Sequence, residues 1–304
     1  MMRKALLWAS TNPWMAKRVT RFGFVRRATR RFMPGEELDE ALGAAASLAK
    51  DGLSSTLTLL GENHESIGEA DEVVEHYLEA LRQVEACGLD AQISVKPTQL
   101  GLDFGADAAQ ERLGRLVATT DSLVWVDMEA SKYVDDTLAI FRDVQAKHGN
   151  VGLCLQAYLH RTEKDLEALL PLDPPLRLVK GAYNEPESVA IARKTEVDRN
   201  FVRLTARLLR ARVGGGKSRP VIATHDPRMI NEANRLAHEL SLDKKKYEFG
   251  MLYGIAQAEQ RRLARIGHQV RVLISYGPAW FPWYMRRLAE RPANLWFVAK
   301  QLVG

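Results

Sequence analysis

Short apolar runs recur along the chain, and longer stretches with helical periodicity separate them. The runs cover residues 53–62, 89–97, 122–129, 151–157, 175–183, 219–226, 247–252 and 269–277. Strand–helix alternation of this kind predicts a parallel sheet. About eight such units predict a closed (βα)8 barrel, an α/β fold of the TIM type, whose chemistry lies at the carboxyl ends of its strands.

The stretches between and around the runs predict the helices. We expect helices over 64–87, 107–118, 131–148, 162–170, 186–212, 227–240, 254–265 and about 280–302. Residues 1–52 also have a helical pattern, which Met33-Pro-Gly35 interrupts, and an amphipathic helix follows until Gly52. The predicted organisation is an N-terminal helical arm (1–52) packed on a catalytic barrel (53–304), with the last helix over the active site.

Polar side chains stand at or near the ends of the predicted strands. They are Glu62, Lys96, Asp127, Gln156, Lys180 and His225. Because the carboxyl ends of parallel barrel strands meet on one face, these groups predict an enzyme.

Length and composition indicate the number of domains and the cellular compartment. The chain has 304 residues, enough for one barrel with extra helices, and two cysteines, too few for a disulfide framework. Cys154 lies inside an apolar run and is expected to be buried. A reducing cytoplasm fits this usage, and no run approaches the ~20 apolar residues of a spanning helix.

The charge is uneven. Residues 17–31 contain seven Lys or Arg and no acid, against a net charge of +5 for the whole chain. The segment is either a solvated helix face or a surface that attracts anionic lipid, which would place the protein peripherally on the inner face of the cell membrane. No nucleic-acid recognition motif accompanies the charge, and no HExxH or CxxC pattern predicts a metal site.

The segment WFPWYMRRLAERPANLWF (280–297) joins aromatic residues to an arginine pair. On a helix, Glu290 is close enough to brace Arg286 or Arg287. Paired guanidiniums are suited to holding a small carboxylate. A surface charge cluster is the alternative, which the aromatic context disfavours.

The segment LRLVKGAY (176–183) places cations at the end of a buried strand. A buried strand rarely contains Arg177 and Lys180 without anionic partners, and Gly181 and Ala182 allow close approach of a ligand to the backbone. A flavin cofactor would supply an electron-rich ring and a pyrophosphate. A salt-bridge network with Asp127 is the other explanation.

With these segments in view, the chain resembles the proline dehydrogenase family, in its short monofunctional bacterial type. The resemblance covers residues 59–294 in family order, through LLGE, SVKPTQLG, VDME, LQAYLHRT, LRLVKGAY, ATHD, YEFGMLYG and YMRRLAERPAN. It implies a (βα)8 barrel with non-covalent FAD at its C-terminal face. It also implies oxidation of L-proline to Δ1-pyrroline-5-carboxylate, the first step of proline catabolism, with electrons passed to a quinone. The oligomeric state stays open, and a homo-oligomer is compatible with the sequence.

The resemblance assigns roles to matching residues. Asp127 and Arg177 would act beside the flavin ring, with Arg177 near N5. Proline would be bound by Lys96, Arg286, Arg287, Glu290, Leu252 and Glu62. FAD would be contacted by Met128, Gln156, Val179, Lys180, Gly181, Ala182, Thr224 and His225. No general base for the substrate amine is identifiable.

The last strand departs from the family pattern. Leu273 stands where the family usually has a tyrosine that shapes the substrate pocket, and Ser275 replaces a proline. Gly250 stands where a larger polar residue is usual. These changes put strict substrate selection in doubt.

Two other functions remain open on the residues alone. A barrel lyase or aldolase would use Lys96 as a Schiff-base amine. A barrel that binds a ligand without turnover would use the same pocket.

Overall fold

The computed structural model describes residues 29–62 and 64–290. Its strands form one closed, all-parallel barrel in sequence order, β1 to β8. The strands are Ser54–Leu59, Ala91–Val95, Val124–Val126, Val151–Gln156, Leu176–Val179, Val221–Ala223, Glu248–Leu252 and Gln269–Tyr276. Each lies within a predicted apolar run, so the (βα)8 prediction is confirmed.

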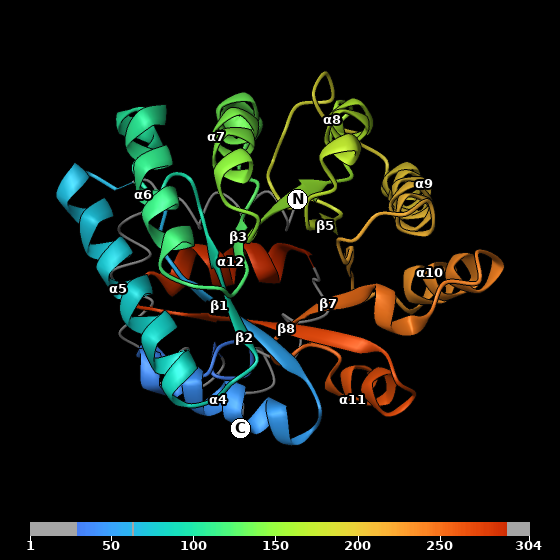
Figure 1. Cartoon of the computed structure of the whole chain (residues 1–304), viewed down its shortest axis with the longest axis horizontal. Helices are drawn as coiled ribbons and strands as arrows, with labels where there is room; N and C mark the ends of the chain where they lie inside the picture. The colour runs from blue at the N-terminus through green and yellow to red at the C-terminus, as the bar shows by residue number, and fades with distance from the viewer. Residues whose placement is uncertain (1–28, 63, 291–304) are drawn as a thin grey trace.

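Helices surround the barrel (Figure 1). They are α4 (Leu38–Lys50), α5 (Ile67–Ala86), α6 (Ala106–Ala118), α7 (Val134–Lys147), α8 (Thr162–Leu169), α9 (Lys194–Val213), α10 (Pro227–Glu239), α11 (Gln257–Arg265) and α12 (Trp280–Glu290). Short 3₁₀ turns flank two of them, Ser131–Tyr133 before α7 and Leu170–Leu172 after α8. Further 3₁₀ turns cover Leu102–Phe104 and Lys244–Lys246.

The strands divide their side chains between two layers. Outward residues such as Leu57, Phe249 and Val272 are fully buried against the helices. Inward positions include polar or small residues such as Thr56 and Gly250, beside larger ones such as Trp125 and Leu273. A barrel interior is usually filled by bulky branched side chains, so this composition leaves space inside the strand ring.

The helix that covers β1 and β8 precedes the barrel in sequence. Leu38, Ala41 and Leu42 of α4 pack with Leu57 and Ile274, and the segment ends where Gly52 adopts a φ of +72°. The predicted helix is confirmed, and it ends at Lys50, two residues before the predicted end at Gly52. The partition into an arm (1–52) and a barrel (53–304) stays a prediction, because residues 29–52 are the part of the arm that the structure describes.

One helix prediction is wrong at its start. Residues 186–193 are not helical, and Ala190 forms an isolated bridge with Leu159 before α9 begins at Lys194. The hydrogen bonds from Ile191 N to Tyr158 O and from His160 N to Val189 O hold this segment against the loop after β4. These tertiary contacts override the local helical pattern.

Candidate active site

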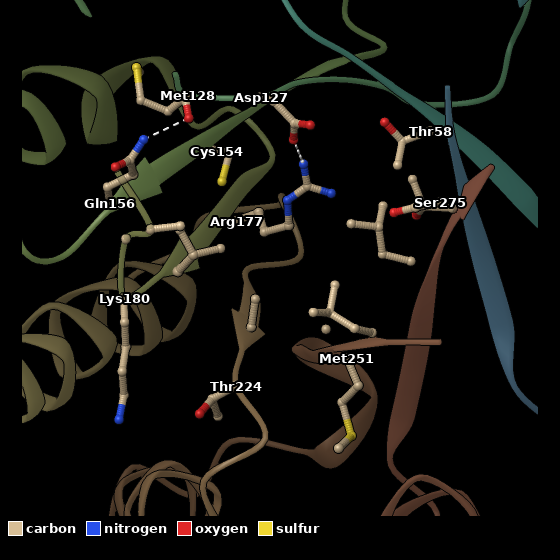
Figure 2. A pocket seen from close by; sticks show the side chains of 18 of the residues that line it. Thr58, Asp127, Met128, Cys154, Gln156, Arg177, Lys180, Thr224, Met251 and Ser275 are labelled. Atoms are coloured by element: carbon tan, nitrogen blue, oxygen red, sulfur yellow. Dashed lines mark hydrogen bonds and ion pairs between the residues drawn. The ribbon is translucent and has the colours of Figure 1, made fainter. Parts of the chain in front are cut away.

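A cavity of about 440 Å³ opens at the carboxyl ends of the barrel strands (Figure 2). Every predicted site residue whose side chain the structure describes lines it. These are Glu62, Lys96, Asp127, Met128, Gln156, Arg177, Val179, Lys180, Gly181, Ala182, Thr224, His225 and Leu252. Residues spread over nearly two hundred positions of the chain therefore meet in one place.

An ion pair crosses the upper part of the cavity. Arg177 Nη2 donates to Asp127 Oδ1 and, at 2.9 Å, to Ser94 Oγ, and the guanidinium lies 4.8 Å from the Trp125 ring centre (Figure 2). Burial by itself lowers the pKa of Arg177, but the Asp127 carboxylate raises it, so the guanidinium stays charged. The predicted salt bridge between Arg177 and Asp127 is thus present, and both residues also line the cavity.

Gln156, at the end of β4, presents an unused acceptor. Its Nε2 donates to the carbonyls of Met128 at 2.6 Å and Glu129 at 2.9 Å. These bonds fix the orientation of the amide, and within the described residues its buried Oε1 has no hydrogen-bond partner. A buried acceptor of this kind calls for a donor from a ligand or water.

Lys96 follows β2 in a turn that buried contacts hold. Glu129 accepts hydrogen bonds from Thr98 N at 2.9 Å and Thr98 Oγ1 at 2.7 Å, and Gln99 Nε2 donates to Leu59 O at 2.9 Å. Lys96 Nζ lies 3.5 Å from the same Leu59 carbonyl. Burial raises the pKa of Glu129 to about 7, which the two Thr98 hydrogen bonds only partly oppose.

Gly181 makes the turn after β5 possible. Its φ is +112°, and a Cβ there would lie 2.1 Å from the Tyr158 ring. Only glycine fits this position. The turn directs Lys180 away from Asp127 and Arg177, along the β6 side of the cavity (Figure 2).

The ends of β6 and β7 are joined by a histidine. His225 Nε2 accepts a hydrogen bond from Leu252 N at 2.8 Å, and Thr224 N donates to Gly250 O at 3.0 Å. Because Nε2 is an acceptor here, the ring carries no proton on that nitrogen. Thr224 and Leu252 are thereby fixed in the wall.

Helix α12 stands at the mouth of the cavity on an aromatic cluster. Trp280, Phe281 and Tyr284 pack with Phe32 and Met33, while Trp283 reaches the cavity lining. Arg286, Arg287 and Glu290 lie further along α12, and their side chains are outside the described part of the structure. Their predicted roles stay predictions.

Several lining residues were not predicted to belong to the site. They are Thr56, Thr58, Trp125, Cys154, Lys194, Asp226, Met251 and Trp283. Thr56 and Thr58 lie in register with Leu273 and Ser275, so the period-two pattern of β1 and β8 could have found them. Lys194 starts α9, far from any strand end, and carries no such signal.

The described residues include no group of three or more His, Cys, Asp or Glu side chains that could hold a metal ion. Among them there is also no helix with the length and apolarity to cross a membrane.

Comparison with known proteins decides the family. The proline dehydrogenase family model matches residues 41–300. The chain belongs to the proline dehydrogenase family.

Its relatives match it along almost the whole length. Proline dehydrogenase 1 of Bacillus subtilis subsp. natto is 35% identical over 306 residues, covering 100% of this chain and 99% of the relative. The proline dehydrogenase of Deinococcus radiodurans is 36% identical over 283 residues, covering 90% and 89%.

Solved structures show the same fold in a larger protein. Proline utilization A from Bdellovibrio bacteriovorus, in a crystal structure of the form inactivated by N-propargylglycine, superposes with a TM-score of 0.81 at 24% identity. That alignment covers 95% of this chain but 36% of the larger one, so the chain spans about a third of its length.

Proposed function

We propose that this proline dehydrogenase family member oxidises L-proline to Δ1-pyrroline-5-carboxylate as the first step of proline catabolism, with FAD as the hydride acceptor. The observation that carries the proposal is the meeting of all described candidate residues in one cavity at the barrel's C-terminal end. In this reaction the C5–H bond breaks, a C5=N bond forms and the amine loses a proton.

The cavity walls fit a flavin nucleotide. Gln156 Oε1 is a buried acceptor that the N–H group of a flavin ring can satisfy. Gly181 lines the cavity in a turn that packs against the Tyr158 ring, and Lys180 and Lys194 supply positive charge for a diphosphate. Met128, Val179, Ala182, Thr224 and His225 complete the set of residues that would hold the cofactor. When bound, FAD accepts a hydride at N5.

The chain's own residues supply orientation and charge. Lys96, with Arg286 and Arg287 braced by Glu290, would hold the proline carboxylate, which fixes the ring for transfer. Leu252 would form the pocket wall and Glu62 the entrance. Arg177 would stabilise negative charge that develops beside it, and Asp127 keeps its guanidinium in place.

We further propose that a quinone receives the electrons and that the protein associates peripherally with the membrane. The basic segment 17–31 supports association with anionic lipid. Nearly all of that segment lies outside the described residues. Co-sedimentation with anionic and neutral vesicles at two salt concentrations tests it, and equal binding to both would leave the segment as a solvated face.

The function is tested with purified protein, proline and an artificial electron acceptor. We expect equimolar bound flavin, proline-dependent dye reduction and a product that an aminobenzaldehyde traps as the pyrroline adduct. Borohydride trapping of a carbonyl substrate on Lys96, without flavin, would instead indicate the lyase. Proline binding without dye reduction would indicate a binding protein.

A further inference from the structure

A cluster of charged side chains closes the cavity between β5 and β6. Lys180 and Lys194 line the cavity, as does Asp226, which caps the first turn of α10 through Arg228 N. Asp198 of α9 is absent from that lining and lies behind it. The cluster therefore has members that face the ligand space and one buried member that does not.

Asp198 bonds to three cations. Its Oδ1 accepts from Lys180 Nζ at 2.5 Å, and its Oδ2 accepts from Lys194 Nζ at 2.8 Å and Arg228 Nη2 at 3.3 Å. Asp226 Oδ2 is the second acceptor, at 3.3 Å from Lys180 Nζ and 2.8 Å from Arg228 Nη2. Asp198 is thus the one carboxylate in this cluster that holds both cavity-lining lysines.

Asp198 is buried, whereas two of the cations that it binds are exposed. The Asp198 side chain is 11% exposed, whereas those of Lys194 and Arg228 are 71% and 69% exposed. Burial by itself raises the pKa of Asp198, but the bonds from Lys180 and Lys194 lower it, so the group stays ionised. A buried, ionised carboxylate fixes long lysine side chains that would otherwise sample many rotamers.

With three cations and two carboxylates, the cluster keeps an excess positive charge at the cavity edge. The N-termini of α9 and α10 lie here too, and helix N-termini favour anions. A diphosphate is the anion that the proposed cofactor would bring. Ammonium groups held before the ligand arrives cost less ordering on binding.

We propose that Asp198 is a positioning residue for the cofactor site: it holds Lys180 and Lys194 where they bind the FAD diphosphate. This inference rests on the proposed function. The expected effect of removing Asp198 is opposite to that of charge alone, because removing a negative charge near the anionic diphosphate should by itself strengthen FAD binding. The sign of the effect therefore separates positioning from charge.

The test measures FAD binding to the flavin-depleted full-length chain, with quenching of flavin fluorescence as the readout. We expect Asp198→Asn to weaken FAD binding about 10- to 100-fold, by analogy with the loss of affinity when outer partners of metal ligands are removed. Glu196→Gln is the matched control, because Glu196 lies on the same helix, is exposed and pairs with Arg193. We expect that variant to bind FAD like the parent, and both apoproteins to have similar melting temperatures.

A double-mutant cycle shows whether Asp198 acts through its lysines. In a Lys180→Gln background, Asp198→Asn should weaken FAD binding by a clearly smaller factor than in the parent, since coupled residues are not additive. An equal factor in both backgrounds, or tighter binding by Asp198→Asn, overturns the inference. A parent chain that does not bind FAD overturns the proposed function instead, which keeps the two failures apart.

Discussion

Two buried arginines lie inside the same barrel, and they differ in what surrounds them. At the amino ends of the strands, Arg271 Nε donates to Glu248 at 2.8 Å, while its Nη1 reaches Ser55 O at 2.8 Å and Asp90 at 3.2 Å. Arg177, the second residue of β5, donates to Asp127 just after β3 and to Ser94 of β2, and both hydrogen bonds come from a single nitrogen, Nη2. Both arginines line the cavity, but the first is saturated by acceptors of the protein at its floor, whereas the second uses one nitrogen and lies beside the cavity residue Asp127.

Burial of an arginine does not by itself indicate a catalytic role. Glu248 is 3% exposed and has Arg219 as a second partner at 3.4 Å, so the Arg271 cluster closes the barrel floor. The Asp127 side chain is 21% exposed and lies among cavity residues. We propose that the Arg271–Glu248 pair stabilises the fold and that the Arg177–Asp127 pair acts in catalysis.

The largest expected effect is on stability. Arg271→Met leaves Glu248 buried with a weakened set of partners, and removing one member of a buried pair costs about 3–5 kcal/mol. Chemical denaturation should show this loss, with the flavin spectrum of the folded fraction unchanged. Arg235→Met is the control, because Arg235 pairs on the surface with Glu232 and Glu239, and exposed pairs are worth about 0–1 kcal/mol. A similar loss in both variants would contradict the role of the Arg271–Glu248 pair.

The next effect is on turnover. Arg177→Met should lower the rate of flavin reduction by about 10²–10³-fold, the cost of removing a donor that stabilises developing charge. Stability should fall less than in Arg271→Met, because Asp127 can be solvated from the cavity. Rapid-mixing absorbance with proline measures the rate. If Arg271→Met slowed reduction as much, the distinction between the two arginines would be lost.

A third test uses pH and the buried carboxyl next to the Lys96 turn. The folded-state pKa of Glu129 is about 7, above its ordinary value of 4.5, because burial disfavours the charged form. The folded state therefore holds this proton more tightly, and the associated stability is present at low pH and is lost as pH rises from about 4.5 through 7. Glu129→Gln should remove this component, on the order of 3 kcal/mol.

Denaturation of both proteins at pH 5 and pH 8 measures that component. The difference in unfolding free energy between Glu129→Gln and the parent should shift in favour of the variant at pH 8. A pH-independent difference would mean that Glu129 titrates alike in the folded and unfolded chains.

A fourth test addresses the arginine pair on α12. Arg286→Met and Arg287→Met should each lower kcat/KM for proline about 10- to 150-fold, since a charge-assisted hydrogen bond is worth about 1.5–3 kcal/mol. Binding of FAD should change far less. Parallel loss of flavin in these variants would indicate that α12 supports the fold and does not hold the substrate carboxylate.

The smallest effect is on selectivity. Leu273 lines the cavity opposite Thr56 in the β1–β8 register, so a tyrosine there would reach the ligand space. Leu273→Tyr should sharpen discrimination of proline over a 4-hydroxylated analogue by about 1–3 kcal/mol. The ratio of kcat/KM values in both proteins measures it. An unchanged ratio would mean that position 273 does not touch the substrate, and lower activity on both substrates would indicate overpacking.

The strand-end residues of the site could be predicted because strand periodicity and motif order place them on one face. The Arg177–Asp127 pair was one of two explanations in the sequence, and the structure shows that the pair and the cavity coexist. Asp198 could not be found in this way, since its partner Lys180 lies on another element and only the folding of α9 against β5 joins them. The helix predicted over residues 186–193 was wrong for the same reason, because the hydrogen bonds of this segment run to residues 158–160.

The central claim is that this cavity brings proline and a flavin together for oxidation. Anaerobic titration of the flavin-loaded protein with proline tests it most directly, with the absorbance of oxidised flavin as the readout. We expect complete bleaching of that band and equimolar formation of Δ1-pyrroline-5-carboxylate. A flavin that stays oxidised under millimolar proline would contradict it.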